Sequence, residues 1–263
     1  MKTIVITGST RGIGLALAKA FLKRSCRVVI SGRSQAAVER SLESLSSLFS
    51  ADLMAGFACD VSDYTQLQAL WQQAGQHFGR IDIWINNAGV SNMLNPPWDL
   101  TPEEIRCVIE TNILGEMYGT SVAMNGFKEQ GSGALYNMEG MGAKSKRKVK
   151  GLSIYGSSKA ALGYFNDAIF EENSNPNILI GAIQPGMMLT DMVMCQYEDR
   201  PEEWEMVKDV LTVLSEDVDV VAAWLAEKIL ANNKNGVRFT YGGTLKILSR
   251  VARKKLSRTG KKA

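Results

Sequence analysis

A tyrosine and a lysine four residues apart are the side chains in this sequence best suited to catalysis. Tyr155 and Lys159 lie in a segment with helical periodicity, so the phenol and the ammonium project from one face of a helix. A nearby cation stabilises a phenolate and lowers the pKa of the tyrosine towards working pH. We therefore expect Tyr155 to donate a proton to a carbonyl group that is being reduced.

A glycine-rich turn near the N-terminus has the form of a dinucleotide-binding loop. It follows an apolar segment, opens a helical one and reads TGSTRGIG. Glycines let the backbone approach a pyrophosphate, and a helix N-terminus supplies N–H donors and the positive end of its dipole. A plain connecting turn is the alternative, which the strand–turn–helix context argues against. The predicted cofactor contacts are Gly8, Ser9, Thr10, Arg11, Gly12, Ile13 and Gly14.

The end of the second apolar segment indicates which dinucleotide is preferred. An acidic residue there would bind the ribose 2′-hydroxyl of NAD, but the sequence has Arg33, and Arg11 lies in the glycine loop. Two guanidinium groups suit a 2′-phosphate, so we expect NADPH; the alternative is that both arginines are solvated surface residues. Asp60 follows the third apolar segment and could accept a hydrogen bond from the adenine amino group. Its neighbour Val61 is placed in the same site.

The elements that position these residues alternate along the chain. Short apolar segments predict strands at Thr3–Thr7, Arg27–Ser31, Leu53–Ala58, Ile81–Ile85, Ala134–Asn137, Ile178–Ile183 and Val237–Tyr241. Periodic segments predict helices at Ile13–Arg24, Gln35–Leu48, Tyr64–Phe78, Pro102–Phe127, Ser153–Asn173 and Val218–Ala231. This alternation predicts an α/β fold, a single Rossmann-type doubly wound parallel sheet with helices on both faces. We expect one domain over residues 1–243, with a helical lid at about 187–214, and a basic tail over 244–263.

The order of these motifs resembles the short-chain dehydrogenase/reductase family. Further matching positions are Asn86, Asn87, Ala88, Gly89, Asn112, Pro185, Gly186 and Thr190. The resemblance implies that Asn87, Ala88 and Gly89 line the adenosine side of the cofactor groove. It also implies that Asn112 holds a water in a proton relay, that Lys159 binds the nicotinamide ribose, and that Pro185, Gly186 and Thr190 belong to the cofactor site, with Thr190 at the carboxamide.

One departure from the family pattern points to a smaller branch. The family places a serine three residues after the Asn that ends the fifth strand, but here the stretch is Asn137-Met138-Glu139-Gly140. This sequence is similar to plant chlorophyll b reductases, which implies a bulky carbonyl substrate such as a tetrapyrrole. Gly140 is then a substrate-site residue whose freed space could admit a large planar ring. We expect Glu139 to point aside and accept hydrogen bonds from backbone N–H groups.

Composition excludes several other classes of protein. The chain has 263 residues, 45% of them hydrophobic, no apolar run long enough to span a membrane, and no signal-peptide pattern, so we expect a cytoplasmic protein. One histidine and four scattered cysteines predict no metal site. Seven basic residues and no acidic one occur in 250–262, and a second basic run occupies 144–150. The tail could contact a membrane surface, whereas nucleic-acid binding has no supporting motif.

Three functions remain open at this stage. The first is an NADPH-dependent reductase of a bulky carbonyl compound, the formyl group of chlorophyll b among them. The second is a general short-chain alcohol dehydrogenase of a small substrate, and the third is a catalytically silent dinucleotide-binding sensor. Apolar stripes on the helices predicted at Pro102–Phe127 and Ser153–Asn173 also predict a homo-oligomer, as does family resemblance.

Overall fold

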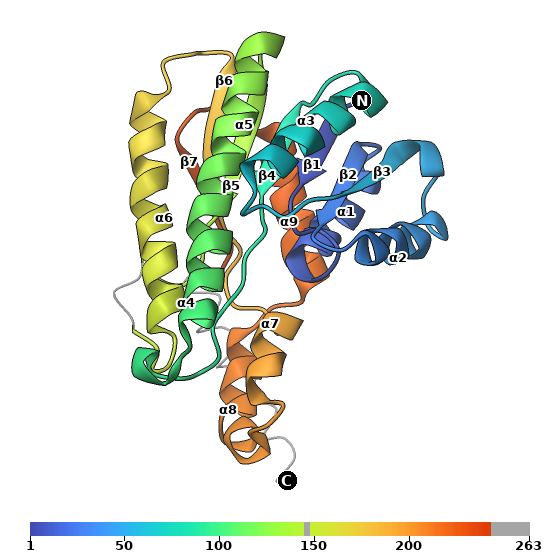
Figure 1. Cartoon of the computed structure of the whole chain (residues 1–263). Helices are drawn as coiled ribbons and strands as arrows, with labels where there is room; N and C mark the ends of the chain where they lie inside the picture. The colour runs from blue at the N-terminus through green and yellow to red at the C-terminus, as the bar shows by residue number, and fades with distance from the viewer. Residues whose placement is uncertain (145–147, 243–263) are drawn as a thin grey trace, which may run out of the picture.

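A seven-stranded parallel sheet forms the centre of the molecule (Figure 1). The computed structural model describes residues 1–144 and 148–242. The strand order is β3-β2-β1-β4-β5-β6-β7, so the chain winds outwards in both directions from β1. The strands are β1 (Thr3–Ile6), β2 (Arg27–Gly32), β3 (Met54–Ala58), β4 (Ile83–Asn86), β5 (Gly133–Met138), β6 (Ile178–Gln184) and β7 (Val237–Thr240). The predicted doubly wound parallel sheet is confirmed.

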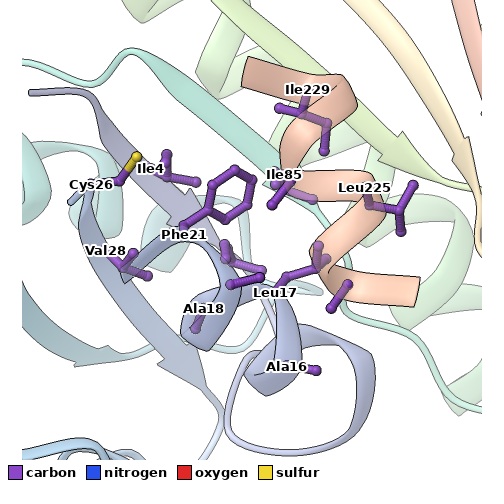
Figure 2. Packing of buried hydrophobic residues seen from close by; sticks show 14 of the residues in the cluster. Ile4, Ala16, Leu17, Ala18, Phe21, Cys26, Val28, Ile85, Leu225 and Ile229 are labelled. Carbon is purple, nitrogen blue, oxygen red and sulfur yellow. The ribbon is translucent and has the colours of Figure 1, made fainter. Parts of the chain in front are cut away.

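Helices cover both faces of the sheet, which explains why the central strands are buried along most of their length. One face is covered by α1 (Gly12–Leu22), α2 (Gln35–Ser46) and α9 (Val218–Ala231), and the other by α3 (Tyr64–Phe78), α5 (Gly115–Gln130) and α6 (Ser153–Glu172). Figure 2 shows the first core, where Leu17 and Phe21 of α1 lie between the sheet and Leu225 and Ile229 of α9. Short 3-10 turns, η1 (Ala51–Leu53) and η2 (Pro97–Asp99), occur in two connections.

The segment predicted as one helix over Pro102–Phe127 contains a change of helical type. It begins as α4 (Pro102–Ile109), widens to a π-helical turn, η3 (Glu110–Leu114), and continues as α5. A π-turn inserts one extra residue per turn and so rotates the side chains that follow it, and such turns are frequent at functional sites. Asn112, a predicted site residue, lies in the middle of this turn. Sequence periodicity does not distinguish a π-turn from an α-helix.

The segment 187–214, which we call the lid, is mainly helical, and its action as a lid stays a prediction. It consists of α7 (Asp191–Met194), a 3-10 turn η4 (Cys195–Tyr197) and α8 (Pro201–Leu214), which project from the same end of the sheet as the start of α6 (Figure 1). The lid is held to the loop after β4, because Arg200 donates hydrogen bonds to Leu94 O at 3.0 Å and Asn95 Oδ1 at 2.6 Å. Its conformation is therefore tied to the loop that carries the predicted adenosine-side residues.

Some of the sequence predictions concern segments that the structure does not describe. The basic tail 244–263 and residues 145–147 of the second basic run lie outside the described residues. Within the described ranges, no helix is both long enough and apolar enough to cross a membrane. Membrane contact through the tail and the boundary at residue 243 stay predictions.

Candidate active site

The glycine loop after β1 is shaped by the close approach of the loop after β4. A Cβ on Gly8 would lie 2.7 Å from Ala88 Cα, and a Cβ on Gly14 would lie 2.5 Å from Asn87 Nδ2. Gly8 also has a φ of +62°, a conformation that residues with a side chain rarely adopt. These two positions therefore require glycine. Asn87 Nδ2 donates to Thr7 O at 2.8 Å and to Gly8 O at 3.0 Å, which joins the two loops.

The residues at this loop fit a dinucleotide phosphate. The N-terminus of α1 has no side-chain cap, since Arg11 makes no capping hydrogen bond, and its first N–H groups therefore point into the loop. Asn87 Oδ1 is buried and has no partner among the described residues, so it is a polar atom suited to a ligand hydrogen bond. A Cβ on Gly12 would lie 3.9 Å from Thr190 Cγ2, which places Thr190 beside the loop. The contact of Thr190 with the carboxamide stays a prediction.

Several predicted cofactor residues have side chains committed to the protein itself. Ser9 Oγ donates to Ile6 O at 2.7 Å and accepts from Ser31 N at 2.9 Å. A Cβ on Gly115 would lie 2.6 Å from Val61 Cγ2, so the Val61 side chain is buried in the core. Only the backbones of Ser9 and Val61 remain for cofactor contacts. Thr10 and Ile13 complete the loop, while Pro185 and Gly186 turn the chain out of β6, where Gly186 has a φ of +80°.

The predicted adenosine end of the groove is a polar cavity. Arg33 and Asp60 both line it, together with Arg106 of α4, and the cavity has a volume of about 210 Å³. Arg11 and Arg33 are exposed and make no ion pair within the described part of the chain, so their guanidinium groups are available to a phosphate. Asp60 Oδ1 accepts from Ser62 N and Oγ at 3.0 and 2.7 Å. Arg106 was missed by sequence reasoning because it lies in a different element.

Tyr155 and Lys159 lie together in α6, but the expected lowering of the tyrosine pKa is not found. Burial raises the pKa of Tyr155 to about 12. The Lys159 ammonium instead donates a hydrogen bond of 2.8 Å to Met138 O at the end of β5. Desolvation also lowers the pKa of Lys159, because a buried ammonium loses its water. In the chain by itself both groups are desolvated, and the charge of Lys159 does not cancel the rise in the pKa of Tyr155.

Gly140 lies directly under the Tyr155 hydroxyl. A Cβ at Gly140 would lie 2.5 Å from Tyr155 Oη and 3.1 Å from Lys159 Cγ. The expectation that Gly140 frees space for a large ring is therefore wrong for this structure, because the phenol itself occupies that space. The missing serine and the position of the proton donor are linked, since a side chain here would displace the hydroxyl.

Asn112 anchors the loop after β4 against α6. Its Oδ1 accepts from Val90 N at 2.8 Å, and its Nδ2 donates to Val90 O at 2.9 Å and to Ser158 Oγ at 3.0 Å. A Cβ on Gly89 would lie 3.4 Å from Asn112 Oδ1 and 3.9 Å from Lys159 Nζ, so Gly89 lies beside both polar groups. The side-chain amide therefore positions the site. Its role with a relay water stays a prediction.

The expected partners of Glu139 were wrong. Its side chain is fully buried and accepts hydrogen bonds from side chains, not from backbone N–H groups. Arg238 of β7 donates two, at 2.8 Å from Nε and 2.7 Å from Nη2. Gln184 Nε2 donates at 2.7 Å and Asn166 Nδ2 at 3.3 Å. The carboxylate meets β7 and is neutralised there by a bidentate guanidinium, as a buried charge requires.

Sequence reasoning missed the polar residues beneath the site. Glu116 is buried four residues after Asn112, and Asn166 is buried seven residues after Lys159. The spacing of seven places Asn166 on the helix face of Lys159, which was a usable signal, whereas the π-helical turn between Asn112 and Glu116 breaks the α-helical spacing there. Asn92 is also buried and accepts from Tyr155 N at 3.1 Å, which fixes the start of α6. Nothing in the sequence distinguishes Asn92 from an ordinary loop asparagine.

Curated relatives of the chain include plant pigment reductases. The chain is 34% identical over 263 residues to chlorophyll(ide) b reductase NOL, chloroplastic, of Arabidopsis thaliana, covering 95% of this chain and 73% of that protein. It is 33% identical over 209 residues to the probable chlorophyll(ide) b reductase NYC1, chloroplastic, of the same plant, covering 73% of this chain. The chain spans only 42% of the length of that second relative. The resemblance to this branch is confirmed.

Solved structures and a family model agree with the observed fold. A crystal structure of actinorhodin polyketide ketoreductase with NADPH has a TM-score of 0.81 and 25% identity, covering 93% of this chain and 97% of that one. Levodione reductase matches with the same TM-score, identity and coverage. The family model for short chain dehydrogenases matches residues 2–201. The chain therefore belongs to the short-chain dehydrogenase/reductase family of oxidoreductases.

Proposed function

We propose that this protein is an NADPH-dependent reductase that converts a carbonyl group of a bulky substrate, such as the formyl group of chlorophyll b, to an alcohol. The observation that carries the proposal is the match to the NOL reductase, which runs along 95% of the chain and so includes the lid as well as the cofactor loop. Tyr155 and Lys159 supply the polar groups that carbonyl reduction needs.

Cofactor binding in this proposal uses the loops after β1 and β4. The uncapped N-terminus of α1 and the backbone of Gly8 to Gly14 hold the pyrophosphate, and Asn87 Oδ1 accepts a hydrogen bond from the cofactor. Arg11 and Arg33 bind the 2′-phosphate, and Asp60 lines the adenine cavity. NADPH, when bound, supplies the hydride for reduction of the carbonyl carbon.

Proton donation in this proposal comes from Tyr155. The hydroxyl gives its proton to the carbonyl oxygen as that oxygen becomes an alkoxide, which leaves a phenolate. The Lys159 ammonium, held through Met138 O, is the positive charge of α6, and in this proposal it stabilises that phenolate in the complex with the cofactor, although it does not do so in the chain by itself. Because burial holds the pKa of Tyr155 at about 12, the phenol stays protonated before the reaction and is ready to act as an acid.

The exposed side chains of the lid support the proposal of a large apolar substrate. Nine large hydrophobic residues are exposed in the described structure, and four of them lie in the segment 187–214: Met187, Met194, Met206 and Val210. A fifth, Trp98, is 82% exposed in η2, on the loop after β4 to which Arg200 of the lid is bonded. Exposed apolar side chains around a site entrance suit a hydrophobic ligand, and flexible methionines adapt to its shape.

Turnover of a formyl-bearing tetrapyrrole tests this proposal. Purified protein is mixed with NADPH and chlorophyllide b, or with a panel of small aldehydes, and NADPH oxidation and pigment absorbance are followed. We expect reduction of the pigment and little turnover of the small aldehydes. Turnover of small aldehydes alone would favour a general alcohol dehydrogenase. NADPH binding without turnover of either class would favour a dinucleotide sensor.

A further inference from the structure

A buried carboxyl group lies beneath the active site and has no part in the chemistry proposed so far. Glu116 is on the sheet-facing side of α5 and is 5% exposed. Its Oε1 accepts a hydrogen bond of 3.4 Å from Asn166 Nδ2 of α6. None of the ion pairs within the described part of the chain includes Glu116. A carboxyl group buried with so little support is costly when ionised.

The same amide nitrogen serves a second carboxylate. Asn166 Nδ2 lies 3.3 Å from Glu139 Oε1, so the two carboxyl groups meet at one donor. Glu139 is paired with the Arg238 guanidinium through two hydrogen bonds, and Glu116 is not. When two carboxylates share a site, the proton goes to the one with the weaker support. The geometry therefore favours a neutral Glu116 beside an ionised Glu139.

Glu116 and Lys159 act on one another electrostatically. Burial raises the pKa of Glu116 to about 8, and the positive charge of Lys159 opposes this rise. Burial lowers the pKa of Lys159, and the charges of Glu116 and Glu139 oppose that change. From β4, the nearby side chain is the neutral amide of Asn86, which donates to the backbone carbonyl oxygen of Glu116 at 3.3 Å and not to its carboxyl group. Lys159 and Glu139 are thus the ionisable groups that face Glu116.

We propose that Glu116 is a positioning residue whose neutral form leaves the Lys159 charge free to stabilise the Tyr155 phenolate. This inference rests on the proposed function. During the reaction the proton leaves Tyr155 for the substrate oxygen, and Glu116 keeps its own proton. As the pH rises, Glu116 loses its proton to solvent. The new anion then competes with the phenolate for the ammonium, and reduction becomes slower.

The first test is the pH profile of kcat/KM in Glu116→Gln. Gln keeps the shape of the neutral acid and cannot ionise. We expect the wild-type value to fall by about three- to tenfold through pH 8 and the Gln variant to keep its value over that range, because a full unit of pKa coupling corresponds to about tenfold. Glu129→Gln, an exposed change in the same helix, is the control and should follow the wild type. Superimposable profiles of wild type and Glu116→Gln would overturn the proposal.

The second test is stability against pH, which needs no turnover. A carboxyl group with a raised folded-state pKa binds more protons in the folded chain than in the unfolded chain between about pH 4.5 and 8, so folding stability falls as pH rises through that window. We expect Glu116 to change the unfolding equilibrium constant of the wild type tenfold per pH unit within this window. The Glu116→Gln variant should lack this contribution. In Lys159→Met the window should extend upwards, because the opposing charge is gone.

These readouts separate this inference from the proposed function. If no carbonyl compound is turned over, the proposed function fails. The pH range over which Glu116 changes the folding stability, and its extension in Lys159→Met, can still be measured by denaturation. A window that does not move in Lys159→Met would show that the two groups are uncoupled, and this overturns the inference. If Glu116→Gln does not fold, the comparison of wild type with Lys159→Met still decides it.

Discussion

Replacing Gly140 by alanine should remove most of the activity by moving the proton donor. The added Cβ would lie 2.5 Å from Tyr155 Oη, whereas a relaxed contact needs about 3.5 Å, so the phenol must retreat by roughly 1 Å. The backbone of β5 cannot yield instead, because Glu139 N is bonded to Ile183 O at 2.8 Å. A misplacement of about 1 Å costs on the order of 10²-fold in rate. We therefore expect a loss of that size in kcat.

Gly140→Ser separates the steric effect from a gain of a hydrogen-bond donor. The family serine supplies a hydroxyl, and a preorganised donor is worth about 10²–10³ in rate. In this chain the hydroxyl arrives with the same Cβ that displaces Tyr155, so we expect the serine variant to be no more than about threefold faster than the alanine variant. The loss should affect large and small aldehydes alike, since it arises at the proton donor and not in the substrate pocket.

The assay is single-turnover oxidation of bound NADPH, with thermal denaturation as the check on folding. NADPH affinity should change by less than about threefold, because Gly140 lies outside the glycine loop and its neighbours there. Gly75→Ala is the matched control, since a Cβ at Gly75 meets nothing within 4 Å. Wild-type turnover in Gly140→Ala would refute the steric argument, and selective loss of the bulky substrate would place the effect in the pocket.

Three further changes test other parts of the site. Tyr155→Phe should lower turnover by about 10²–10⁴-fold and leave NADPH affinity unchanged in a fluorescence titration. Arg33→Asp should reverse the preference for NADPH over NADH, a preference we expect to be at least about tenfold since a charge-assisted hydrogen bond is worth roughly 1.5–3 kcal/mol; equal wild-type affinities would contradict this. Arg238→Met should destabilise the fold by about 3–5 kcal/mol in chemical denaturation, because it leaves the Glu139 carboxylate buried and without its ion-pair partner.

The predicted oligomer interface depends on apolar side chains that differ in their exposure to solvent. Val108, an apolar residue of the helix predicted over Pro102–Phe127, is 2% exposed within the single chain, so it belongs to the core. Tyr164 of α6 is 80% exposed and is the apolar residue of these helices most available to a second copy. Tyr164→Glu should therefore convert an oligomer to monomer in light scattering, while a monomeric wild type would reject the prediction.

Sequence patterns predicted the sheet because the strands at its centre are buried apolar runs. β1 is TIVI with every residue buried, and the site residues follow the strands directly, as in the turn from Ile6 into the glycine loop. The carboxyl ends of parallel strands meet at one edge of the sheet, so the candidate residues were predicted to converge from their order alone. Local information was sufficient for these features.

Contacts between distant residues could not be predicted in the same way. Glu139 and Arg238 are separated by 99 positions, and they meet because β6 lies between β5 and β7 with a register that pairs Ala182 with Asn137 on one side and Arg238 on the other. Nothing local to Arg238 indicates this pairing. The π-turn at Asn112 and the pKa of Tyr155 likewise depend on packing that arises only in the folded chain.

The pairing of Glu139 explains how an acidic residue can stand beside the catalytic pair. An unpaired carboxylate at the end of β5 would repel a developing negative charge on the phenol and on the substrate oxygen. Its two oxygens instead accept four hydrogen bonds, two of them from one guanidinium, and the Met138 carbonyl next to it holds the Lys159 ammonium. The segment Met138–Gly140 thus buries the Glu139 carboxylate with its hydrogen-bond donors and orients the Lys159 ammonium. At Gly140 it also leaves the space that the Tyr155 hydroxyl occupies.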